Sequence, residues 1–144
     1  MSASFFHHWP QSMFEPFVIT SPKTSRYNCI AWAFEDDTKF YWPDDTKLYF
    51  WPSHVPREVT VEAFVKLYES INYKTCDNGD FEDGYNKIAI YSNNGKPTHA
   101  ARQVNEKSWT SKLGIHEDVA HSIEAMQNGS YGNVAVFMKR KKKP

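Results

Sequence analysis

Two stretches of the chain carry apolar residues at the three- and four-residue spacing of an amphipathic helix. The first covers residues 29–34 and follows a polar segment in which Thr24 or Ser25 can act as the N-cap. The second covers residues 59–68, where apolar residues share one face and Thr60 can cap the helix. The pattern therefore predicts two helices in the N-terminal half of the chain.

Alternating apolar and polar residues indicate strands in the second half of the chain. The ranges 87–91 and 98–104 flank Asn93-Asn94-Gly95, a turn of the Asn-Gly kind that joins two strands in a hairpin. We expect further strands at 72–76, 108–113 and 133–138.

A third helix is predicted over residues 117–126. Its first turn carries Glu117 and Asp118, as the positive end of a helix dipole favours, and Asn128-Gly129 can end it. The predicted order is thus two helices, several antiparallel strands and one late helix. This order is typical of an α+β domain and not of alternating βαβ units.

The predicted elements lie between two unusual ends. Residues 1–20 are rich in aromatic residues and punctuated by proline, so we expect an irregular arm laid over the core. Residues 21–138 are expected to form a single domain. Residues 139–144 begin with a basic run, and their terminal position suggests a disordered tail.

Two Trp-Pro pairs, Trp42-Pro43 and Trp51-Pro52, lie between the two predicted N-terminal helices. Proline restricts the residue before it to extended geometry, so this segment is expected to be a loop with its rings held in place. The rings could line a substrate cleft or cover the core, and cover is the preferred interpretation.

The composition argues against several classes of protein. A chain of 144 residues with 40% hydrophobic residues fits one compact domain. The 17 basic residues balance 17 acidic ones, which argues against a general nucleic-acid binder. No segment approaches the roughly 20 apolar residues of a membrane span, and no signal peptide is recognisable. The expected location is the cytoplasm, which two sparse cysteines also fit.

Cys29 is the candidate nucleophile. It lies at the start of the first predicted helix, where the positive end of the helix dipole favours the thiolate. The alternative is a cysteine that only fills core space, which is common for this residue. Cys76 has neither a helix start nor a neighbouring histidine, so we interpret it as structural, and a disulfide between the two cysteines stays open.

His99 is the candidate general base, because it is the only one of the six histidines on a predicted central strand. A cysteine hydrolase also needs a group that orients the imidazole. The candidates for this group are, in order, Ser111, Gln103 and Asp118. Ser111 comes first because it would lie opposite Ala101, on the face of His99, if the hairpin closes about Glu106. The alternative for His99 is a half-buried histidine bonded to the backbone.

The oxyanion of an acyl transfer also needs hydrogen-bond donors. The backbone N–H of Cys29 is the default donor, because it lies at a helix N-terminus. Asn28 is a candidate side-chain donor, although it can equally serve only to start the helix. Gln103 is the other candidate for oxyanion or substrate binding. His7-His8 has no further ligand at suitable spacing, so no metal or cofactor is expected.

The order of elements resembles the papain-like cysteine hydrolases, especially the small NlpC/P60- and CHAP-type enzymes and a small bacterial branch of that superfamily. The resemblance is carried by Asn28-Cys29 at a helix start and by the strand–turn–strand that leads to His99-Ala100. It implies a papain-like fold with N-terminal helices packed on a small antiparallel sheet. In that family the base usually heads the first of the two strands, where this chain has Lys87. Either His99 acts as base from the second strand, or the catalytic pair is lost.

The sequence therefore predicts a cysteine hydrolase, namely a peptidase, an amidase or a protein deamidase. It would attack an amide bond of a protein or peptide-like substrate through a thioester. A bacterial toxin or defence effector fits by analogy. The alternative is a catalytically inactive binding domain on the same fold, whose aromatic arm contacts a partner protein. Neither a membrane nor nucleic acid is an expected partner.

Overall fold

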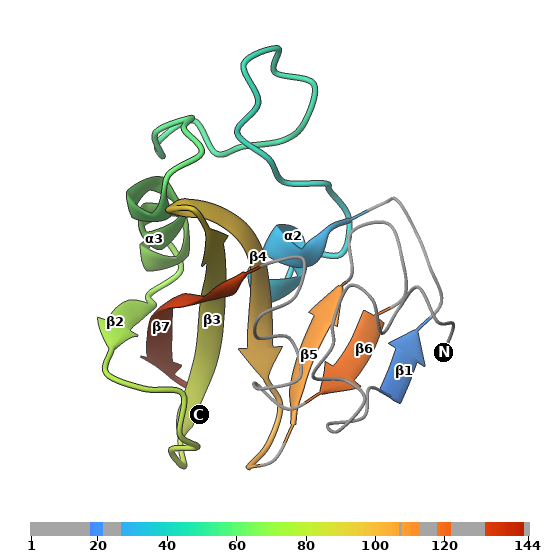
Figure 1. Ribbon diagram of the computed structural model, residues 1–144, viewed down its shortest axis with the longest axis vertical. Helices are drawn as coiled ribbons and strands as arrows, with labels where there is room; N and C mark the ends of the chain where they lie inside the picture. Colours follow the sequence, from blue (N-terminus) through green and yellow to red (C-terminus); the bar gives the residue numbers. More distant parts are fainter. Residues whose placement is uncertain (1–17, 22–26, 107, 113–117, 122–131, 143–144) are drawn as a thin grey trace.

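The computed structural model describes residues 18–21, 27–106, 108–112, 118–121 and 132–142 (Figure 1). Within these residues, seven strands form one antiparallel sheet in the order β1-β6-β5-β4-β3-β7-β2. The strands are β1 (Val18–Ser21), β2 (Lys74–Cys76), β3 (Tyr85–Asn93), β4 (Lys96–Gln103), β5 (Trp109–Lys112), β6 (Asp118–His121) and β7 (Asn133–Lys141). The helices are α2 (Cys29–Ala33) and α3 (Val61–Glu69). The α+β class is confirmed, because separate helices accompany a purely antiparallel sheet.

Both helices begin at a side-chain cap. Thr60 accepts a backbone N–H of the first turn of α3 at 3.1 Å, as the sequence predicts. α2 begins at Asn28, whose side-chain oxygen accepts the N–H of Ala31 at 3.1 Å. The predicted caps Thr24 and Ser25 lie outside the described residues. In the part of the chain that the structure describes, no helix is long and apolar enough to cross a membrane.

The predicted hairpin of β3 and β4 is confirmed. Asn94 and Gly95 have φ angles of +54° and +81°, the left-handed conformations that a two-residue Asn-Gly turn requires. The register of the two strands pairs Tyr91 with His99. The turn therefore fixes which residues of β4 share a face with which residues of β3.

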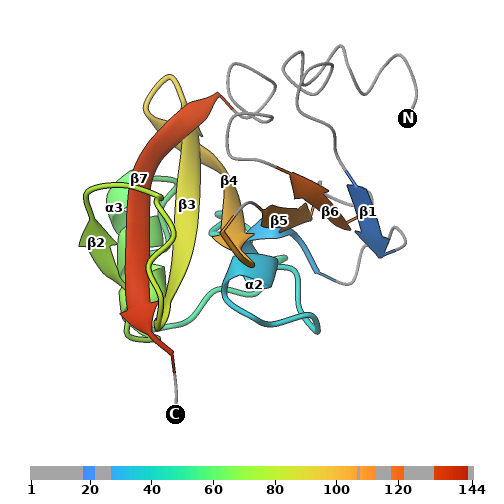
Figure 2. The ribbon, with the colours of Figure 1, turned by 90° about the horizontal axis from the view of Figure 1, so that it is seen from below.

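Residues that pair directly across antiparallel strands project to the same face, so the register divides the sheet into two faces. The helix face carries Ile88, Ile90 and Ala100, which are fully buried in one cluster with side chains of α2 and α3. The far face carries the alternate residues, among them Tyr91 and His99, which are also fully buried. Figure 2, which shows the molecule turned by 90° from Figure 1, shows α2 next to β4.

The helix predicted over 117–126 is wrong for the part that the structure describes. Asp118–His121 forms β6, which pairs with β5 on one side and with β1 on the other. Hydrogen bonds to two neighbouring strands satisfy the backbone of this segment, and they outweigh the local preference of an acidic first turn for a helix. Residues 117 and 122–126 lie outside the described residues.

The predicted domain boundaries also need correction. Val18–Ser21 forms β1, so the end of the predicted arm is a strand of the sheet and not irregular chain. β7 runs to Lys141, so residues 139–141 of the predicted tail belong to the sheet. The pairing of β7 with β3 holds this basic segment in extended geometry, which position along the chain alone does not reveal. The domain therefore extends beyond 21–138 at both ends.

The loop with the two Trp-Pro pairs covers the core, which is the interpretation preferred from the sequence. The rings of Trp42 and Trp51 lie 5.6 Å and 5.3 Å from the ring of Phe64 in α3. Trp51 is buried, and its indole N–H donates to the carbonyl of Pro56 at 3.0 Å. These contacts hold the loop against α3, and between the two pairs the loop projects away from the sheet (Figure 1).

A close approach of β7 to β3 gives a test of the fold. Gly132, directly before β7, has φ +80°, and a Cβ there would lie 2.0 Å from the carbonyl oxygen of Ser92. Gly84 has a similar φ of +85°, but a Cβ there would meet nothing within 4 Å. We expect Gly84→Ala to lower the free energy of unfolding by about 1 kcal/mol through backbone strain alone, and Gly132→Ala by about 2 kcal/mol more through the added clash. Urea denaturation measures both, and equal losses would contradict this approach of the two strands.

Candidate functional site

Cys29 is the first residue of α2 and belongs to the core of the helix face. It is only 6% exposed, in the same buried cluster as Ile30, Tyr68 and Ala100. Neither Cys29 nor Cys76 forms a disulfide, which answers the question that the sequence leaves open. The thiol has the predicted position at a helix start, and its surroundings are those of a core residue.

Asn28, the candidate oxyanion donor, is occupied by structural hydrogen bonds. Its side-chain oxygen accepts the N–H groups of Ala31 and Tyr41, each at 3.1 Å. Its amide nitrogen donates to the carbonyl of Tyr41 at 2.6 Å. With 3% exposure, Asn28 caps α2 and joins it to the extended chain at Tyr41. This geometry favours a structural role for Asn28 at the start of α2 over a role as oxyanion donor.

Tyr68 of α3 is the ionisable neighbour of Cys29 on the helix face. Its hydroxyl donates to the carbonyl of Ile30 at 2.9 Å. Burial raises the pKa of Tyr68 well above its ordinary value, and negative charge at Cys29 raises it further. The phenol therefore stays neutral and committed to a carbonyl of α2, so it does not supply a base for the thiol.

His99, the predicted general base, lies on the far face of the sheet. It is fully buried, and its ring lies edge-on to that of Tyr91, with 5.4 Å between the ring centroids. The next residue of β4, Ala100, projects to the helix face and joins the cluster that contains Cys29. The register therefore places the imidazole on the face of β4 opposite to the cluster that contains Cys29.

The candidates for orienting the imidazole lie on β4, β5 and β6. Gln103 shares the far face with His99, and its side-chain amide donates to the carbonyl of Gly79 at 2.9 Å. The register of β4 with β5, continued by one residue, sets the backbone of Ser111 opposite Ala101, the predicted alignment. Asp118 pairs with Lys112, and Ser111 with Val119, at the β5–β6 boundary. His99, Gln103 and the backbone position of Ser111 therefore share the far face, whereas Cys29 belongs to the cluster on the helix face.

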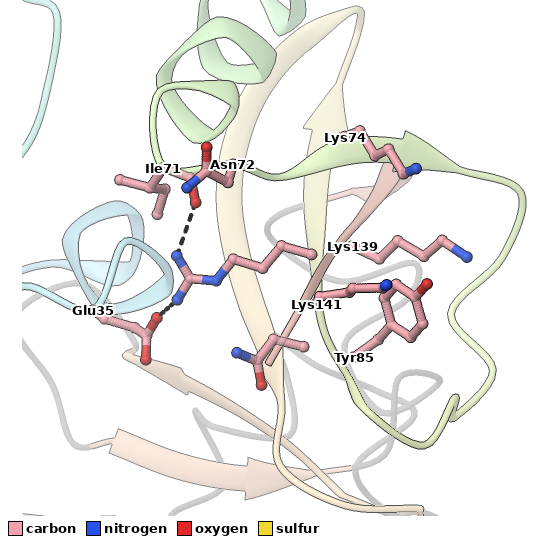
Figure 3. A pocket seen from close by; sticks show the side chains of 9 residues that line it. Glu35, Ile71, Asn72, Lys74, Tyr85, Lys139 and Lys141 are labelled. Carbon is pink, nitrogen blue, oxygen red and sulfur yellow. Dashed lines mark hydrogen bonds and ion pairs between the residues drawn. The ribbon is translucent and has the colours of Figure 1, made fainter. Parts of the chain in front are cut away.

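A different feature, a basic pocket of about 660 Å³, lies where β2 begins beside β7 (Figure 3). Its lining residues are Glu35, Ile71, Asn72, Lys74, Tyr85, Asn86, Lys139, Arg140 and Lys141. The register pairs Lys139 with Lys74 of β2 on one side and with Lys87 of β3 on the other. These three residues, called the lysine row below, lie side by side on the far face. Lys141 follows two positions after Lys139 and shares that face.

Glu35 forms the opposite wall of this pocket and holds the end of α2 to the sheet. The N–H groups of Glu35 and Asp36 bond to carbonyls of the last turn at 3.0 Å and 2.9 Å, which is a Schellman motif. Glu35 has φ +67°, a conformation that usually selects glycine. Its carboxylate pairs with Arg102 of β4 at 3.8 Å and with Arg140 of β7. The guanidinium of Arg102 also lies 3.9 Å from the ring centroid of Trp32, so two strands fix the helix end.

Residues 18–139 match the sequence profile of a family described as Domain of unknown function (DUF7689). The chain belongs to the DUF7689 family. No curated protein and no solved structure matches the chain. The DUF7689 match covers both described helices and all the described strands except the last two residues of β7. It thus covers the lysine row as well as Cys29 and His99.

No pattern in the sequence predicts the lysine row of the DUF7689 domain. Lys74 and Lys87 fall within predicted strands, and Lys139 falls in the predicted tail. The alternation of the last strand could be continued into the basic run, which would place Lys139 and Lys141 on one face. The alignment of lysines from three strands depends on pairings between distant segments, which no local pattern encodes.

We expect Asn28→Ala to lower the free energy of unfolding of the DUF7689 domain by about 2–4 kcal/mol, because it removes a cap and two buried hydrogen bonds to Tyr41. Thr60→Ala is the matched control, since its side chain caps α3, and we expect a loss of about 1 kcal/mol. Urea denaturation compares the two. A loss for Asn28→Ala no larger than for Thr60→Ala would contradict the structural role of this residue.

Proposed function

We propose that this DUF7689-family protein acts as a binding domain, and not as a cysteine hydrolase that uses Cys29 with His99. The observation that supports the proposal is the position of the two side chains on opposite sides of β4. A general base must come within about 3 Å of the group that it deprotonates, or reach it through one water. Neighbouring residues of a strand project to opposite faces, so this placement argues against both arrangements.

Lys87 supports the same proposal. It stands at the position where papain-like enzymes usually have their base, and its side chain is 4% exposed on the far face. Its ammonium donates to the carbonyl of Asn78 at 3.3 Å and pairs with Glu82 at 3.6 Å. An ammonium group is a donor without an acceptor site, so it cannot accept a proton from a thiol. We propose that the fold keeps the papain-like order of elements without a catalytic pair.

The basic pocket is the candidate binding surface. Lys74 and Lys141 are exposed at its rim, and Tyr85 and Asn86 add neutral hydrogen-bonding groups. The chain as a whole carries no net charge, so the concentration of basic side chains at this place is a local feature. The proposed function thus assigns recognition to the edge of the sheet at β2 and β7.

The competing function is hydrolysis of an amide by Cys29 with a group other than His99 as base. The observation that favours it is the position of Cys29 at the first residue of α2, behind a well-formed cap at Asn28. Hydrolysis requires a thiol that reacts readily with small electrophiles in the folded protein. The two functions therefore differ in the chemical behaviour of one side chain.

We expect Cys29, isolated by Cys76→Ser, to react with iodoacetamide at least about tenfold more slowly than Cys76, isolated by Cys29→Ser, because Cys29 is buried. The two thiols should react at equal rates in guanidinium chloride. His99→Gln, with the fold checked by circular dichroism, should leave the rate at Cys29 unchanged. A thiol pKa well below the ordinary ~8.5 that rises in His99→Gln would overturn the proposal.

A further inference from the structure

The lysine row places three like charges directly opposite one another across neighbouring strands. Lys139 faces Lys74 of β2 and Lys87 of β3 in the two ladders. Neighbouring strands lie about 4.8 Å apart, so the row spans only about 10 Å. Like charges that face each other across a sheet are destabilising. The fold therefore concentrates positive charge at this place.

One carboxylate offsets part of this charge. Glu82 receives two hydrogen bonds from the ammonium of Lys139, at 3.0 Å and 3.1 Å, and lies 3.6 Å from that of Lys87. The bonds from Lys139, followed by the charges of both lysines, lower the pKa of Glu82, so it stays ionised. Among the described residues, no carboxylate pairs with Lys74 or Lys141. The charge of the row is thus only partly neutralised.

The two remaining charged groups of the pocket neutralise each other. Arg140 projects to the opposite face from Lys139, where it pairs with Glu35 and donates to the carbonyl of Ile71 at 3.0 Å. Its guanidinium also lies 4.6 Å from the ring centroid of Tyr73. Arg140 is therefore held by the fold. The remaining basic residues of the pocket are Lys74 and Lys141, and Lys139, whose ammonium bonds to Glu82.

Figure 3 shows the side chains of Lys74, Lys139 and Lys141 extending in the same direction, with Tyr85 beside them. The ammonium of Lys139 lies 4.6 Å from the ring centroid of Tyr85, which places the phenol next to the row. The ammonium groups of Lys74 and Lys141 and the phenol of Tyr85 are hydrogen-bond donors that lie beside Lys139, whose ammonium already donates to Glu82. Such a set suits a ligand that brings several anionic oxygens.

We propose that this pocket binds a small ligand with two or more adjacent phosphate groups, such as a diphosphate or triphosphate. The inference rests on the proposed binding function. A volume of about 660 Å³ falls in the range of small-molecule sites. Lys74 and Lys139 lie opposite each other on neighbouring strands, and Lys141 follows Lys139 by two positions, so the three lysines of the pocket are close enough for neighbouring phosphates of one ligand. Nucleic acid is less suited, because its recognition needs a longer basic surface than this balanced chain presents.

Isothermal titration with inorganic pyrophosphate and tripolyphosphate, at constant ionic strength, tests the proposal on the full chain. We expect both to bind, and the double variant Lys74→Gln/Lys141→Gln to raise Kd at least about tenfold, a loss of about 1.4 kcal/mol. Both lysines are exposed, so the variant should fold. Lys96→Gln, which removes an exposed charge at the β3–β4 turn, is the matched control and should leave Kd unchanged.

Three outcomes would overturn the inference. The first is no binding of either phosphate at millimolar concentration. The second is equal weakening by the control and the double variant, which would indicate a general charge effect. The third is tighter binding of citrate or of a single-stranded oligonucleotide than of tripolyphosphate. The reactivity of Cys29 is measured in a separate experiment. A slowly reacting thiol together with any of these three outcomes would contradict the ligand assignment alone. A readily reacting thiol whose pKa depends on His99 would contradict the proposed binding function.

Discussion

The register of β3 against β4 is the constraint on which the rest of the structure depends. The turn at Asn94 and Gly95 sets it, and it assigns Ala100 to the helix face and His99 to the far face. A slip of one residue would exchange the two faces of β4 and carry the imidazole to the side of α2. The same slip would expel Ala100 from the core. The register therefore decides both how the helices pack and whether Cys29 can meet a base.

Tertiary contacts on the helix face stabilise α2. A helix of five residues is too short to be stable alone, so tertiary contacts must hold it. Asn28 fixes its start to the chain at Tyr41, and Tyr68 bonds to its first turn from α3. Glu35 fixes its end to arginines of β4 and β7. Cys29 is thus held within a structural junction, which accounts for its burial at a helix start.

Local patterns predict part of this fold, and long-range pairing decides the rest. The spacing of apolar residues and the cap at Thr60 are sufficient for α3, and the Asn-Gly turn is sufficient for the central hairpin. The sequence does not show which residues of β4 face the helices. Both faces of β4 are buried, so the usual alternation of apolar and polar residues is missing at His99 and Ala100. The strand at Asp118–His121 and the lysine row both depend on pairing with strands distant in sequence. Local patterns therefore predict a helix at the first place and a disordered tail at Lys139, and both predictions are wrong.

The most direct test of the account is a nuclear Overhauser experiment on the folded protein with assigned side chains. The account predicts contacts between the ring protons of His99 and Tyr91, whose ring centroids lie 5.4 Å apart. It also predicts that the methyl group of Ala100 shows contacts to the core cluster that contains Cys29 and Tyr68. A contact between the ring of His99 and the β-protons of Cys29 would contradict the separation of the two side chains and would favour the function of a cysteine hydrolase.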